Sequence, residues 1–68
     1  MSQELEDFLC KEFKITPDEL MALDADAISD LFDEASDIEV GEVIAGRSEG
    51  DRCRLACELQ DYINDNLM

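Results

Sequence analysis

The sequence has no histidine and no tryptophan, and its 68 residues include only one proline, three glycines and five basic side chains. The absence of histidine removes the commonest general base and metal ligand, together with every Ser-His or Cys-His nucleophile pair. The three glycines stand too far apart to form a phosphate-binding loop. We therefore expect a protein that is not an enzyme and uses no cofactor.

Long apolar runs are also missing. No stretch approaches the roughly 20 apolar residues of a membrane-spanning helix, and residues 1–20 are rich in charged side chains where a secretory signal needs an apolar segment. The three cysteines are an odd number and do not suggest a disulfide framework. These absences predict a reduced, cytoplasmic protein that does not contact membranes.

Basic residues are scarce relative to acidic ones. Nineteen Asp and Glu residues stand against five Lys and Arg residues, which gives a formal net charge of −14. Such a surface repels nucleic-acid phosphates, so we expect no direct binding of nucleic acid. It attracts basic partners and accelerates encounter with them. The solubility of a small protein is the alternative explanation for the same charge.

What the sequence does contain is the pattern of one folded helical domain, residues 1–68. Its apolar fraction of 46% is ordinary for a globular domain. The longest periodic segment is residues 51–67, where one helical face recurs over about four turns. The apolar positions of that face are Leu55, Ala56, Leu59, Ile63 and Leu67. We expect this segment to be the scaffold on which the shorter helices pack.

Capping signals divide the preceding chain into shorter helices. Ser2 predicts the start of a helix over residues 2–14. Thr16 and Glu19 form a capping box that predicts a short helix over residues 17–23. A third helix is expected to begin at Asp24 or Asp26. Its apolar face consists of Ile28, Leu31, Phe32 and Ala35.

A further capping box, Ser36 with Glu39, predicts a fourth helix that ends at Gly46. The apolar residues of this helix are Ile38, Val40, Val43 and Ile44. A strand through Ile38 and Val40 is the alternative, but a single strand would have no partner. The predicted fold class is therefore all-α, a small compact bundle of four to five short helices with a longer C-terminal helix.

Acidic side chains on the third helix and just after it form the candidate binding site. Carboxylates spaced along a rigid helix can imitate the charge spacing of nucleic acid. The residues in question are Asp30, Asp33, Glu34, Asp37, Glu39 and Glu42. We expect them to bind a basic protein surface, which would make the protein a regulator or an inhibitor. A merely solvated acidic face is the alternative.

Three of the five basic residues, Arg47, Arg52 and Arg54, lie close together in the sequence. They could contact a carboxylate or phosphate of a partner, or they could form salt bridges with acidic neighbours. Cys53 and Cys57 share one side of the C-terminal helix, where we expect them to pack in the core or at its edge. The neighbouring Arg52 and Arg54 could instead lower a thiol pKa. No metal site is expected, because a zinc site needs more ligands.

Two segments resemble acyl carrier proteins. Residues 13–20 are similar to the end of that family's first helix and the following loop, and residues 61–64 are similar to its last helix. The family consists of small acidic helical bundles with phosphopantetheine on a serine at the start of the second long helix. The resemblance implies a carrier module modified on Ser36. In place of the family's Asp-Ser-Leu motif, however, Ser36 stands between Ala35 and Asp37, and residues 36–62 are too few for the family's second and third helices.

The leading hypothesis from the sequence is thus a small acidic, non-enzymatic protein that binds another macromolecule. A carrier module modified on Ser36 is one alternative. A helical protein that self-associates through an apolar stripe on the C-terminal helix is another.

Overall fold

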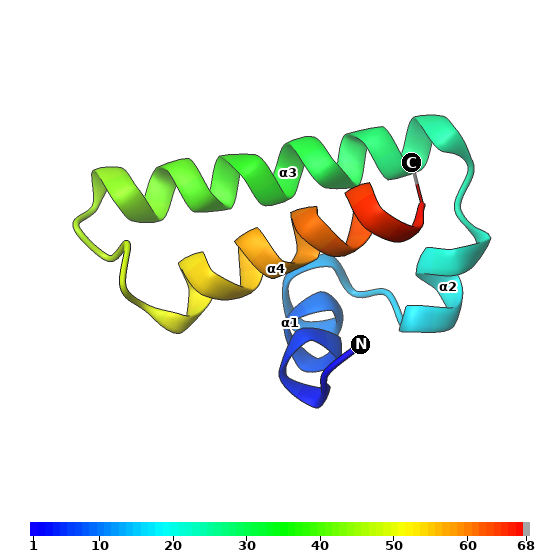
Figure 1. Cartoon of the computed structure of the whole chain (residues 1–68), viewed down its shortest axis with the longest axis horizontal. Helices are drawn as coiled ribbons and strands as arrows, with labels where there is room; N and C mark the ends of the chain where they lie inside the picture. Colours follow the sequence, from blue (N-terminus) through cyan, green and yellow to red (C-terminus); the bar gives the residue numbers. More distant parts are fainter. Residues whose placement is uncertain (68) are drawn as a thin grey trace.

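The computed structural model describes residues 1–67 and contains four helices and no strand within that range (Figure 1). The helices are α1 (Gln3–Phe13), α2 (Pro17–Ala22), α3 (Ala25–Ile44) and α4 (Asp51–Asn66). The all-α prediction is confirmed, and the helix count agrees with the lower of the two expected numbers.

An antiparallel pair, α3 and α4, forms the frame of the molecule (Figure 1). The helix α1 packs against α4 and crosses it, so that Figure 1 shows α1 nearly end-on. The short α2 links α1 to the start of α3. In this arrangement α4 lies between α1 and α3, and one face of α3 points away from the rest of the chain.

Three helix starts agree with their capping signals. The backbone N–H groups of Leu5 and Ala27 donate to the side chains of Ser2 and Asp24, at 3.2 and 2.8 Å. Before α2, the reciprocal capping box of Thr16 with Glu19 is complete. Each cap satisfies a backbone donor that the helix itself leaves without a partner. These starts are therefore encoded locally.

The predicted fourth helix is wrong as a separate element, and so is the strand alternative, because residues 25–44 form one continuous helix. The Ser36 capping box lies inside this helix and starts nothing. Ile28, Leu31 and Ala35 are buried along one face, and Ile38 packs against the same core. A break at Ser36 would have turned Ile38 away from the core face that Ile28, Leu31 and Ala35 share, so burial of this face outweighs the local capping signal.

The expectation that the C-terminal helix is the longest is also wrong. The helix α3 has 20 residues and α4 has 16. Even so, α4 contributes most to the core, because Ala56, Leu59 and Ile63 are fully buried. Within residues 1–67, no helix is both long enough and apolar enough to span a membrane.

The core is a single cluster to which all four helices contribute. It comprises Leu5, Phe8, Leu9, Leu20, Ile28, Leu31, Ala35, Leu55, Ala56, Leu59 and Ile63. Full burial of a Leu or Ile side chain contributes about 1.5–3 kcal/mol. Packing of apolar side chains from all four helices is therefore the main source of stability in so small a domain.

Alanine substitutions at two glycines in and just after α3 should change the stability of the protein in opposite directions. Gly41 lies inside α3, and a Cβ atom there would meet no atom within 4 Å, so Gly41→Ala should raise the free energy of unfolding by about 0.5–1 kcal/mol. Gly46 lies just after the end of α3 with a φ of +79°, a conformation that residues with a Cβ atom rarely adopt. Gly46→Ala should therefore lower the free energy of unfolding by about 1–2 kcal/mol. Urea denaturation followed by circular dichroism measures both. A destabilised Gly41→Ala variant would contradict a continuous, exposed α3 at this point.

Candidate functional site

Four exposed carboxylates line one side of α3, at Asp30, Asp33, Glu34 and Asp37. Their spacing of three, four and seven residues places them on one face of the helix. Among the described residues 1–67, no basic group forms an ion pair with any of them. They are therefore the part of the predicted acidic site that the fold leaves open.

Glu39 and Glu42, the other two residues of the predicted site, turn toward α4 instead. The Glu39 carboxylate accepts hydrogen bonds from Cys57 Sγ and Gln60 Nε2, each at 2.9 Å. The Glu42 side chain is only 5% exposed. The structure therefore does not place these two residues on the open acidic face, because the turn of the helix carries them to its inner side.

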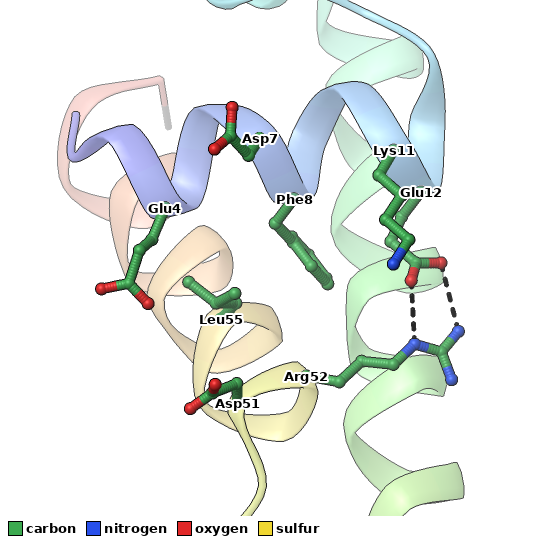
Figure 2. Close-up of a pocket in the computed structure, with 8 residues that line it drawn as sticks. All are labelled: Glu4, Asp7, Phe8, Lys11, Glu12, Asp51, Arg52 and Leu55. Carbon is green, nitrogen blue, oxygen red and sulfur yellow. Dashed lines mark hydrogen bonds and ion pairs between the residues drawn. The ribbon is translucent and has the colours of Figure 1, made fainter.

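Glu42 is a nearly buried anion in the last turn of α3, where the helix dipole disfavours negative charge. Arg47 Nε donates to Glu42 Oε2 at 2.6 Å, and Arg52 Nη1 lies 3.7 Å from Glu42 Oε1. Arg52 also binds the Glu12 carboxylate with two hydrogen bonds, at 3.0 and 3.2 Å (Figure 2). Arg52 thus ties the first turn of α4 to both α1 and α3, and the pairing compensates the buried charge.

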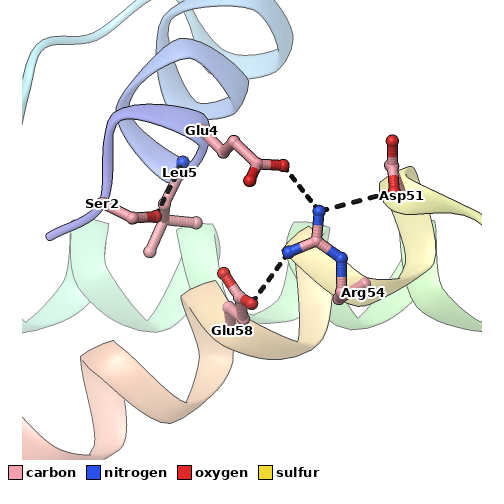
Figure 3. Close-up of polar contacts among 6 residues, drawn as sticks. All are labelled: Ser2, Glu4, Leu5, Asp51, Arg54 and Glu58. Carbon is pink, nitrogen blue, oxygen red and sulfur yellow. Dashed lines mark hydrogen bonds and ion pairs between the residues drawn. The ribbon is translucent and has the colours of Figure 1, made fainter.

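Arg54 joins the N-terminal turns of α1 and α4 (Figure 3). Its Nη2 atom lies 2.6 Å from Glu4 Oε2 and 3.4 Å from Asp51 Oδ1, and its Nη1 atom lies 3.0 Å from Glu58 Oε1. These carboxylates raise the pKa of the Arg54 guanidinium, with Glu4 the largest cause. The structure therefore shows all three arginines in salt bridges with acidic neighbours, and their contact with an anion of a partner stays a prediction.

The last two turns of α3 expose apolar side chains that the sequence analysis placed on a separate fourth helix. Val40, Val43 and Ile44 are 52%, 53% and 81% exposed. Their register follows from the single long helix, since Val40 and Ile44 each lie seven residues after an acidic member of the open face. If a new helix began at Ser36, the apolar residues and the carboxylates would not share one helical face. The seven-residue spacing is visible in the sequence, but it indicates a shared face only because α3 is continuous.

Two shallow grooves lie beside α1. The larger, about 320 Å³, has Phe8 and Leu55 among its lining residues, with Arg52 already bonded to Glu12 on its rim (Figure 2). The smaller is about 220 Å³. Its lining residues are Phe13, Ile15, Leu23, Ala27, Asp30, Leu31 and Glu34. The smaller groove thus adjoins the open acidic face, since Asp30 and Glu34 belong to both.

The cysteines are free thiols in different surroundings: Cys10 is exposed, Cys53 is buried and Cys57 is half-buried. The hydrogen bond to Glu39, followed by burial, raises the pKa of the Cys57 thiol from an ordinary value of 9.0 to about 12. The alternative in which Arg52 and Arg54 lower a thiol pKa does not hold for Cys57, because these arginines bind carboxylates elsewhere. Within the part of the chain that the structure describes, no cluster of three acidic or thiol side chains could hold a metal ion.

Ser36 lies in the middle of α3 and is half-buried. The carrier resemblance implied a serine at the start of a helix, where it would be accessible to a modifying enzyme. The observed position differs from that expectation because α3 does not break at residue 36. The position of Ser36 within the helix therefore does not support the carrier hypothesis.

The Glu39–Cys57 contact makes a testable prediction for thiol reactivity. Glu39→Gln removes the anion that destabilises the thiolate, so the Cys57 pKa should fall and alkylation at pH 9 should accelerate about tenfold. Iodoacetamide labelling followed by mass spectrometry, in a Cys10→Ser background, measures the rate. Glu58→Gln is the control and should leave the rate unchanged, because Glu58 pairs with Arg54. Equal rates in Glu39→Gln and the parent would contradict the contact.

The same contact predicts a pH dependence of stability. The folded-state pKa of Cys57 is raised, so its contribution is fully present below pH 9 and is lost as the pH rises toward about 12. The pKa of Glu39 is lowered by the Cys57 and Gln60 hydrogen bonds, so its contribution is lost on acidification. Between neutral pH and pH 10, the free energy of unfolding should therefore fall less steeply in Glu39→Gln than in the parent protein. Urea denaturation at several pH values measures this difference.

Comparisons of this chain with protein-family models, with curated proteins and with solved structures find no significant match. The open acidic face of α3 and the apolar residues at its end are therefore interpreted from their own chemistry.

Proposed function

We propose that the protein is not an enzyme and works by binding a basic surface of another protein through the outward face of α3. The observation that carries this proposal is the contrast between the three arginines and the carboxylates on the outward face of α3. All three arginines form ion pairs within the fold, whereas Asp30, Asp33, Glu34 and Asp37 form none within residues 1–67. This negative face is therefore available for cations supplied by a partner.

The rigidity of α3 supports the same proposal. The carboxylates from residue 30 to residue 37 lie on one continuous helix and span roughly 10 Å at the usual helical rise. Fixed, closely spaced anions are what a protein surface built to hold nucleic-acid phosphates binds. The proposed role is accordingly a regulator or inhibitor of a basic protein, acting in the reducing cytoplasm, where its three free thiols would persist.

The apolar end of α3 supplies what a charged face lacks. Exposed ion pairs contribute little affinity but increase association rates, whereas burial of apolar side chains slows dissociation. Val40 and Ile44 continue the line of the carboxylates along the helix, so one partner surface can cover both. The expected partner surface therefore combines Lys and Arg residues with an adjoining apolar patch.

Charge reversal on this face tests the proposal. The protein is immobilised, exposed to cell lysate at low and high salt, and the retained proteins are quantified by mass spectrometry. A basic protein should be held at low salt and released at high salt. The double variant Asp33→Lys/Asp37→Lys should lose it by at least tenfold, because like charges then face each other.

The matched control reverses two exposed carboxylates on the other long helix, Asp61→Lys/Asp65→Lys, at the same spacing of four residues. It changes the net charge by the same amount and should retain the partner. If both variants release the partner equally, total charge rather than the α3 face governs binding. If neither releases it, the α3 face is not the binding site.

The apolar residues make a separate prediction for the purified complex. Val40→Ser/Ile44→Ser should weaken binding by roughly tenfold, since it removes apolar area from the interface at about 25 cal/mol per Å². The slope of log Kd against log salt should not change, because no charge is lost. Isothermal titration calorimetry at several salt concentrations measures both quantities. Unchanged affinity would exclude the apolar end from the interface.

A further inference from the structure

We propose that the smaller groove receives one lysine or arginine side chain of the partner, an inference that rests on the binding function proposed above. The groove lies between the end of α1, the segment before α2, the segment after α2, and α3. Its lining combines an apolar floor with two carboxylates. That combination matches a long side chain with an aliphatic stem and a cationic head.

The α3 side of the groove has a helical repeat. Ala27, Asp30, Leu31 and Glu34 follow one another at spacings of three, one and three residues and share one side of the helix. Asp30 and Glu34 are exposed, while Leu31 is buried. Residues four apart on a helix have Cβ atoms about 5–6 Å apart. One guanidinium or ammonium group can therefore contact both carboxylates at once.

The floor of the groove is supplied by the preceding elements. Phe13, Ile15 and Leu23 are half-buried hydrophobic residues that pack against the core. The Phe13 ring packs edge-to-face against the Phe8 ring at a centroid distance of 5.9 Å, which helps to fix its position. Apolar atoms left half-exposed around a groove gain from contact with the methylene groups of a bound side chain.

The size of the groove favours a side chain over a metabolite. Its volume of about 220 Å³ lies below the roughly 300–1,000 Å³ of typical small-molecule sites. No cation of the chain itself fills it, since neither Asp30 nor Glu34 has an ion-pair partner in residues 1–67. The larger groove is a weaker candidate because Arg52 already bonds Glu12 there.

Butylguanidinium is a suitable probe, because it reproduces the stem and head of an arginine side chain. A titration followed by ¹H–¹⁵N NMR should give saturable shifts for the amides of residues 13–15 and 23–34. Methylguanidinium should bind at least tenfold more weakly, because it lacks the methylene groups that contact the floor. Equal affinity for the two probes would show that binding depends on charge alone, and would contradict the proposal that the groove binds a lysine or arginine side chain.

A matched pair of variants separates this inference from the general binding function. Asp30→Asn/Glu34→Gln removes the groove carboxylates, while Asp33→Asn/Asp37→Asn removes two exposed carboxylates outside the groove at the same spacing. The first should abolish the saturable butylguanidinium shifts, and the second should leave them within about twofold. If both double variants weaken the probe alike, the groove is not a site.

The captured partner provides the last arm of the test. Asp30→Asn/Glu34→Gln should reduce its affinity more than Asp33→Asn/Asp37→Asn does, by about fivefold or more. Equal losses would overturn the groove as a pocket for the partner's side chain while leaving the proposed α3 interface standing. If no partner is lost by charge reversal of α3, the proposed function itself fails, whatever the probe shows.

Discussion

The packing of α3 against α4 is the constraint on which the rest of the structure depends. Leu31 and Ala35 on one helix, and Leu59 and Ile63 on the other, are almost completely buried in the shared core. Because this contact extends along most of α3, the helix continues through a serine that would otherwise start a new one. The contact also determines which residues of α3 face inward and which remain in water.

The distribution of charge follows from that division. Acidic residues on the inner side of α3 are paired with donors. Glu39 accepts hydrogen bonds from Cys57 and Gln60. Glu42 forms ion pairs with Arg47 and Arg52. Arg54 and Arg52 also tie α1 to α4. With the arginines engaged inside the fold, the outer side of α3 keeps its negative charge uncompensated. The proposed binding function rests on this asymmetry.

The apolar end of α3 and the smaller groove add chemical selectivity to a surface that charge alone would leave unspecific. In the proposed function, electrostatic attraction would bring basic proteins to the helix but would distinguish poorly among them. As proposed, the groove with its apolar floor and two carboxylates would select a cationic side chain at a defined place. Val40 and Ile44 would add a contact with an apolar patch of the same partner. Together these features describe a partner more closely than net charge does.

The sequence by itself determined the elements whose signals are local. The caps at Ser2, Thr16 and Asp24 and the apolar period of α4 depend on residues within one or two turns, so the helices starting there were predictable. Only the tertiary structure decided that Ser36 lies inside a helix and that Glu42 is buried. Capping energies of about 1 kcal/mol are smaller than the burial of several aliphatic side chains, so packing against α4 outweighed the local signal. The direction of each carboxylate, inward or outward, depends on that same packing, which is why the open acidic face could be predicted only in part.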